Sequence, residues 1–107
     1  MEISKKDWQL FREKLPEWQE NYMDKLISEY ISLLNDDKAS SEKFWELEKR
    51  INNDKRSPGV CVQLRKSDML SVLLGLIYDH VICYDDLNEF SSDVKKMVKS
   101  IAERNQI

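Results

Sequence analysis

The sequence predicts an all-α fold: one domain over residues 1–107, built as a compact bundle of about five helices. Three observations favour this class. A chain of 107 residues is long enough for one hydrophobic core. It contains only two glycines and two prolines, fewer turn-forming residues than a sheet protein of this size needs. Its apolar residues recur at steps of three and four, the period of an amphipathic helix.

The first two helices are predicted on either side of Pro16. Ser4 and Asp7 have the spacing of a capping box, so a short helix begins there. Pro16 lacks a backbone N–H and disfavours helical conformation at Leu15, so we expect the helix to restart or kink at this point. The second helix, 16–35, has the clearest apolar stripe. The stripe consists of Leu15, Trp18, Tyr22, Met23, Leu26, Ile27, Tyr30, Ile31 and Leu34.

A third helix is predicted over 42–53, capped by Ser40 or Ser41, and a long irregular segment over 55–66 follows it. The helix has a short apolar stripe of Phe44, Leu47 and Ile51, with Trp45 beside it. The segment contains a Ser-Pro-Gly turn at 57–59, in which glycine permits a positive φ. Residues 60–64 alternate in polarity but have no sheet to join, so we expect them to pack over the core as a strap.

The fourth helix, 68–81, is predicted to be buried at the centre of the bundle, capped by Ser67. Its apolar residues cover nearly its whole circumference, which is typical of a helix surrounded by others. Gly75 in its middle indicates the close approach of a neighbouring helix. A short turn capped by Asp85 then leads to a last helix, 93–104, capped by Ser91 or Ser92.

The chain lacks the residue patterns of a catalytic, metal or cofactor site. It has one histidine, His80, which we expect to be a capping or surface residue. Cys61 and Cys83 are not in a Cys-x-x-Cys motif, and we expect both to be reduced and buried. Glycine occurs only at positions 59 and 75, so phosphate-binding loops are excluded. The sequence therefore predicts a protein that is not an enzyme and holds no cofactor.

The net charge is −3, but charges of opposite sign are concentrated in different parts of the chain. A basic region around 49–66 is the first candidate for partner binding, since arginines can clamp phosphates or carboxylates. Its residues are Lys49, Arg50, Lys55, Arg56, Arg65 and Lys66. The alternative is an acidic face that could imitate nucleic acid in a basic groove. Its residues are Glu17, Glu20, Asp24 and Glu29. Two ordinary solvated surfaces remain a third interpretation.

The sequence predicts a soluble, cytoplasmic protein that does not enter the membrane. Its N-terminus lacks the apolar region of a signal peptide. The longest apolar stretch, 69–82, is interrupted by polar residues and is shorter than the roughly 20 residues that a membrane span needs.

These observations favour a small interaction protein, a regulator or inhibitor that docks on a larger protein. One form of this hypothesis is a mobile-element accessory that blocks a host defence enzyme. The alternative is a nucleic-acid-associated regulator that uses the 49–66 segment together with Lys95, Lys96 and Lys99. Helices 42–53 and 68–81 are too far apart in sequence for a helix-turn-helix. A homodimer is compatible with each hypothesis, and any exposed tryptophan is a natural contact residue.

Several stretches resemble a family of small uncharacterised proteins of Gram-positive bacteria. They are Asp-Trp-Gln-Leu-Phe-Arg at 7–12, Pro-Glu-Trp-Gln-Glu at 16–20, Glu-Lys-Phe-Trp-Glu-Leu-Glu at 42–48, Asp-Lys-Arg-Ser-Pro-Gly-Val at 54–60 and Asp-Asp-Leu-Asn-Glu-Phe-Ser at 85–91. Members of that family are sometimes labelled multidrug transporters, a label that the absence of a membrane-spanning stretch contradicts. The resemblance implies a bacterial host, and it carries over no site residues.

Overall fold

The computed structural model describes residues 2–104, and its first helix, α1 (Lys5–Leu34), continues for 30 residues. The predicted capping box is confirmed: the Asp7 N–H donates to the Ser4 hydroxyl (3.1 Å), which donates to the Asp7 carboxylate (3.0 Å). The restart expected at Pro16 is wrong, because Pro16 lies inside α1. Leu15 and Leu26 are buried on either side of it, and their packing outweighs the roughly 3 kcal/mol that an interior proline costs.

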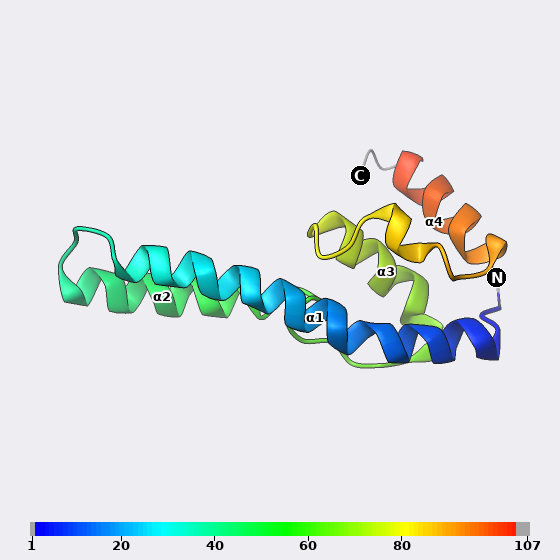
Figure 1. Ribbon diagram of the computed structural model, residues 1–107, viewed down its shortest axis with the longest axis horizontal. Coiled ribbons are helices and arrows are strands. Elements are labelled where there is room, and N and C mark those ends of the chain that lie inside the picture. The colour runs from blue at the N-terminus through cyan, green and yellow to red at the C-terminus, as the bar shows by residue number, and fades with distance from the viewer. Residues whose placement is uncertain (1, 105–107) are drawn as a thin grey trace.

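The other α-helices are α2 (Ser40–Asp54), α3 (Met69–Tyr78) and α4 (Ser92–Arg104) (Figure 1). Short 3₁₀ helices precede α3 and α4, at η1 (Lys66–Asp68) and η2 (Tyr84–Leu87). Residues 2–104 therefore contain four α-helices and no strand, and the expected count of five is wrong because α1 includes the first two predicted helices.

The helix caps agree with the prediction only in part. Ser91 caps α4, since the Val94 N–H donates to the Ser91 hydroxyl at 3.3 Å. The residue before α2 is Ala39, which provides no side-chain cap. Ser67 lies inside η1 and does not cap α3. The turn at η2 begins after Cys83, not at the predicted Asp85.

α3 ends earlier than the predicted helix 68–81, and a residue in the left-handed conformation follows its C-terminus. His80 has a φ of 61°. The His80 N–H donates to the Ile77 carbonyl (3.1 Å), and the Val81 N–H donates to the Leu76 carbonyl (2.8 Å). This pair of bonds is the Schellman motif that ends many helices. The expectation that His80 is a surface residue near a helix end is confirmed.

One part of the molecule, which we call the head, consists of the N-terminal half of α1 together with α3, η2 and α4 (Figure 1). Its core comes from all of these elements and from Ile3. The buried core residues are Ile3, Phe11, Leu15, Met69, Leu73, Leu76, Ile82, Leu87, Phe90, Val94 and Val98. On α3, Leu70, Val72, Leu74 and Ile77 are half-buried against this core, and Tyr78 is exposed.

A second part, the arm, is the hairpin of α1 residues 22–34, the connecting loop and α2 (residues 22–54). α2 packs beside the C-terminal half of α1 and projects away from the head (Figure 1). The molecule is consequently elongated, with extents of 52 × 27 × 20 Å, and the predicted compact bundle is wrong. No residue of α2 is buried, so its short apolar stripe has not drawn it into the core.

Segment 55–66 returns from the arm along α1 to the head. The Gln19 side-chain amide donates to the Pro58 carbonyl at 2.9 Å, and Val62 packs half-buried against the core. The expected strap is therefore confirmed. The positive φ expected at Gly59 is wrong. A Cβ there would lie 2.6 Å from the side chains of both Tyr22 and Val81, so close approach requires the glycine.

Gly75 also lies at a close approach, but the neighbour is the turn of the strap and not the expected helix. A Cβ at this position would lie 3.2 Å from Cγ of Pro58. The strap therefore packs directly on α3.

Candidate interaction surface

The two helices of the arm are joined by polar contacts. The Tyr30 hydroxyl of α1 donates to the Asp54 carboxylate at 2.5 Å. Arg50 of α2 donates to Glu29 (3.0 Å), lies 3.8 Å from the Asp54 carboxylate, and has its guanidinium 5.4 Å from the centre of the Tyr30 ring. These contacts link the two helices at one edge of the hairpin.

Tyr30 has a shifted pKa as a result. Burial raises the pKa of its phenol, and the hydrogen bond to Asp54 and the negative charge of Asp54 raise it further, to about 12. The phenol is therefore the donor at neutral pH, and Asp54 is the acceptor.

One side of the arm is an apolar face that the rest of residues 2–104 leaves exposed. On α1 it consists of Ile27, Ile31 and Leu34, which are exposed by 52%, 54% and 43%. On α2 it consists of Phe44 and Ile51, exposed by 63% and 39%, with half-buried Leu47 between them. In folded proteins, exposed apolar surfaces of this extent are typical of protein, ligand or membrane contact sites.

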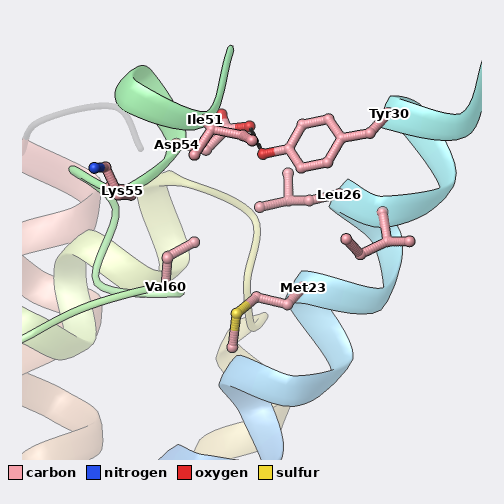
Figure 2. A pocket seen from close by; sticks show the side chains of 8 residues that line it. Met23, Leu26, Tyr30, Ile51, Asp54, Lys55 and Val60 are labelled. Atoms are coloured by element: carbon pink, nitrogen blue, oxygen red, sulfur yellow. Dashed lines mark hydrogen bonds between the residues drawn. The ribbon is translucent and has the colours of Figure 1, made fainter. Parts of the chain in front are cut away.

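The apolar face ends in a pocket at the base of the arm, where the hairpin meets the strap (Figure 2). The pocket has a volume of about 210 Å³. Its lining is almost wholly apolar, with the Tyr30–Asp54 hydrogen bond at one side (Figure 2). The lining residues are Met23, Leu26, Ile27, Tyr30, Ile51, Asp54, Lys55 and Val60. Because Ile27 and Ile51 border the same pocket, the apolar residues of the two helices lie on the same side of the hairpin.

Of the three tryptophans, Trp45 is the exposed one. Trp8 and Trp18 are half-buried against the core of the head. Trp45 is 60% exposed, and its ring is 4.9 Å from that of Phe44 in an edge-to-face arrangement. An aromatic pair thus borders the apolar face on α2.

The predicted basic residues do not converge on one patch. Arg50 is paired with Glu29, and Lys55 lines the apolar pocket. Arg65 donates to its neighbour Gln63 at 3.0 Å, and Lys66 lies beside Glu2 in a shallow hollow of the head. The remaining members lie on or beside α2: Lys49 next to Trp45, and Arg56 near Tyr22 and Asp79.

The lysines predicted on the last helix are also apart from this segment. Lys96 and Lys99 are exposed and Lys95 is half-buried, and all three are on α4 in the head (Figure 1). The two basic regions of the nucleic-acid hypothesis therefore belong to different parts of an elongated molecule.

The predicted acidic face is reduced to three members. Glu17, Glu20 and Asp24 are exposed and follow one another at helical spacing along α1. Glu29 comes five residues after Asp24, which places it about 140° further around the helix, and it is paired with Arg50. Toward the tip of the arm, the line of these three acids along α1 is continued by apolar residues: Ile27, Ile31 and Leu34.

Residues 2–104 contain no group of three or more His, Cys, Asp or Glu side chains that could hold a metal ion. Cys61 and Cys83 are free thiols, and both are exposed, so the expectation that they are buried is wrong. Neither cysteine is part of the hydrophobic core.

The apolar face was not identified from the sequence as a surface, because its residues have the same spacing as core residues. Ile27, Ile31 and Leu34 belong to the stripe predicted to face inward. One signal was available: this stripe is wider than the face that one neighbouring helix can cover. The sequence does not indicate which side of so wide a stripe stays uncovered.

None of the helices within residues 2–104 has the length and apolar character needed to cross a membrane. Comparisons of the chain with protein-family models, with curated proteins and with solved structures find no match. The resemblance to a Gram-positive family is therefore not supported by a family model.

Proposed function

We propose that this chain is a non-catalytic protein-interaction module and that the apolar face of the arm is its contact surface. The observation that carries the proposal is the exposure of Ile27, Ile31, Leu34, Phe44 and Ile51 on one side of a hairpin. Complete burial of a fully exposed side chain of this size contributes about 1.5–3 kcal/mol. These five side chains are about half exposed, so a partner that covers them gains roughly half of that from each.

The polar residues around the face support the same function. The charges that hold the hairpin together, such as Arg50 and Glu29, are already paired within the arm. Trp45 stands next to Phe44 at the margin, and tryptophan is enriched among the residues that dominate binding energies. This pattern of an apolar centre with a polar rim is typical of protein interfaces.

The arm also suits the hypothesis of a regulator or inhibitor. A regulator or inhibitor that docks on another protein needs a surface that its own fold leaves open, and the arm provides one. The three exposed acids, Glu17, Glu20 and Asp24, adjoin the apolar row and would add selectivity for a partner with a basic margin.

The test is affinity capture of the tagged chain from a lysate of its source cells, with nuclease, compared between Ile31→Asp and Ser32→Asp. Both variants add one negative charge to adjacent exposed positions of α1, but Ser32 is outside the apolar face. We expect stoichiometric protein partners, including an untagged copy of the chain, to be lost with Ile31→Asp and kept with Ser32→Asp. Partners that persist with Ile31→Asp, or that vanish with nuclease alone, would refute the proposal.

A further inference from the structure

The apolar face and the pocket at its base also indicate what covers them. We propose that the occupant is a second copy of this chain, and that two arms stack face to face, antiparallel, into a four-helix bundle. This inference rests on the proposed function and names the partner at the same surface. It follows from the position of the face relative to the head, from its spacing and from its area.

The head does not obstruct the apolar face. Ile27 comes 16 residues after Phe11, and Ile31 comes 16 residues after Leu15. At 3.6 residues per turn, each pair lies about 160° apart around the helix axis. Phe11 and Leu15 are buried in the head. The apolar row of α1 therefore points to the opposite side of the helix, and two arms can meet without a collision between heads.

The spacing of the face is self-complementary. Ile27 and Leu34 are seven residues apart on α1, and Phe44 and Ile51 are seven residues apart on α2. Seven residues are two helical turns, or about 10 Å. A two-fold axis across the middle of the arm places Ile27 on Leu34 of the second copy. The same axis places Phe44 over Ile51 of the second copy, as the symmetric dimer interface requires.

The pocket then receives an anchor from the other copy. Ile51 borders the pocket, so the antiparallel arrangement brings Phe44 of the second copy to its opening. A cavity of about 150 Å³ with apolar walls is large enough to bind benzene, and this pocket has about 210 Å³. Phe44 is 63% exposed and lies toward the tip of the arm, away from the pocket of its own chain.

The exposed area of the apolar face is large enough for a dimer interface of ordinary size. The five exposed side chains of the face present on the order of 500 Å² of apolar surface. Apolar atoms make up about 60% of a typical interface, so this corresponds to about 800 Å² per copy, the standard value for a specific complex. Toward the head the row changes to Glu17, Glu20 and Asp24, which confines the contact to the arm.

The experiment is sedimentation equilibrium of the full chain between about 1 and 100 μM, the range in which the weaker interfaces of this size dissociate. We expect a dimer. Ile31→Asp places two like charges near the two-fold axis and should raise the dissociation constant at least 100-fold. Phe44→Ala empties both pockets and should raise it at least about 10-fold. Ser32→Asp is the matched control and should dimerise like the unaltered chain.

The outcomes separate this inference from the proposed function. A chain that stays monomeric at the highest concentration refutes self-association, and so does a dimer that Ile31→Asp leaves intact. In the first case, a different protein captured by the unaltered chain and lost with Ile31→Asp would still support the proposed function. Circular dichroism that shows equal helix content in all variants excludes misfolding as the cause of a lost dimer.

Discussion

Asp7 and Ser91 are 84 positions apart in the chain and are joined by two hydrogen bonds. The Asp7 carboxylate accepts from the Ser91 N–H at 2.9 Å and from the Ser91 hydroxyl at 2.7 Å. Asp7 is the first-turn acid of α1, and Ser91 is the cap of α4. One buried carboxylate therefore ties together the beginnings of two helices.

Replacement of Asp7 should destabilise the head. Asp7→Ala leaves the N–H and hydroxyl of Ser91 without their acceptor, and such a loss typically costs about 2–4 kcal/mol when the acceptor is charged. Urea unfolding measures the change. Asp93→Ala is the matched control: Asp93 is an exposed first-turn acid of α4, and its loss should cost less than about 1 kcal/mol. Equal losses for the two variants would contradict this account.

The same carboxylate should make stability depend on acidic pH. Burial alone would raise the pKa of Asp7, but hydrogen bonds from Ser91 and Ser4 outweigh it and hold the pKa below 3.8. Because the folded state favours the ionised form, the contribution is present above pH 3.8 and is lost as the pH falls through the lowered pKa. As the pH is lowered through and below 3.8, the free energy of unfolding should fall less steeply for Asp7→Asn than for the unaltered chain. Asparagine has no charge to lose. Identical slopes would show that Asp7 is not the group involved.

The phenol of Tyr30 should lose its proton only at high pH, and its hydrogen bond should stabilise the arm. Tyr30→Phe removes the hydrogen bond to Asp54, at a cost of about 1 kcal/mol. The pKa of Tyr30 is raised to about 12, so its contribution is complete below pH 10 and is lost as the pH rises through about 12. Burial also raises the pKa of Tyr22, so Tyr22→Phe is the matched comparison. The tyrosinate absorbance phase near pH 12 should disappear with Tyr30→Phe and remain with Tyr22→Phe. The opposite result would assign that phase to Tyr22.

His80 occupies a left-handed position that suits glycine. Its φ of 61° costs a residue with a Cβ about 1–2 kcal/mol. His80→Gly should therefore raise the melting temperature, by a free-energy gain of about 1 kcal/mol. His80→Ala keeps the Cβ and should give no gain. If both variants lose stability, the imidazole itself contributes to the native state.

Gly59 should tolerate no side chain, in contrast to Gly75. A methyl group at 59 would lie 2.6 Å from Tyr22 and Val81, so Gly59→Ala should cost about 1–3 kcal/mol. At 75 the methyl group would lie 3.2 Å from Pro58, and the gain in helix propensity of about 1 kcal/mol offsets that strain. Thermal melts of the two variants provide the comparison. A larger loss at 75 than at 59 would mean that the strap packs differently.

The sequence predicted the helical class, the capping box at Ser4 and the strap, because each depends on local spacing or composition. It did not predict the arm, because the apolar period shows which residues share a helical face but not which element covers that face. Pro16 is a second example. Its local preference favours a break, but buried residues on both sides of it keep α1 continuous.

The candidate site was predicted in part for a related reason. Charge runs such as 49–66 are visible in the sequence, whereas their pairing is not: Arg50 meets Glu29 only because the hairpin brings them together. The apolar face has no distinguishing mark at all, since Ile27 and Ile31 have the spacing of core residues. Its exposure is a property of the tertiary structure.

The separation of 84 positions between Asp7 and Ser91 has a consequence for synthesis on the ribosome. The contacts of the arm join nearby residues, and the Tyr30–Asp54 pair is only 24 positions apart. Such local pairs form early and fast, whereas contacts between distant segments form late. The arm can therefore pair while the chain is still growing, but the core around α1 in the head is not complete until α4 emerges. The newly made chain is most vulnerable to aggregation during that interval.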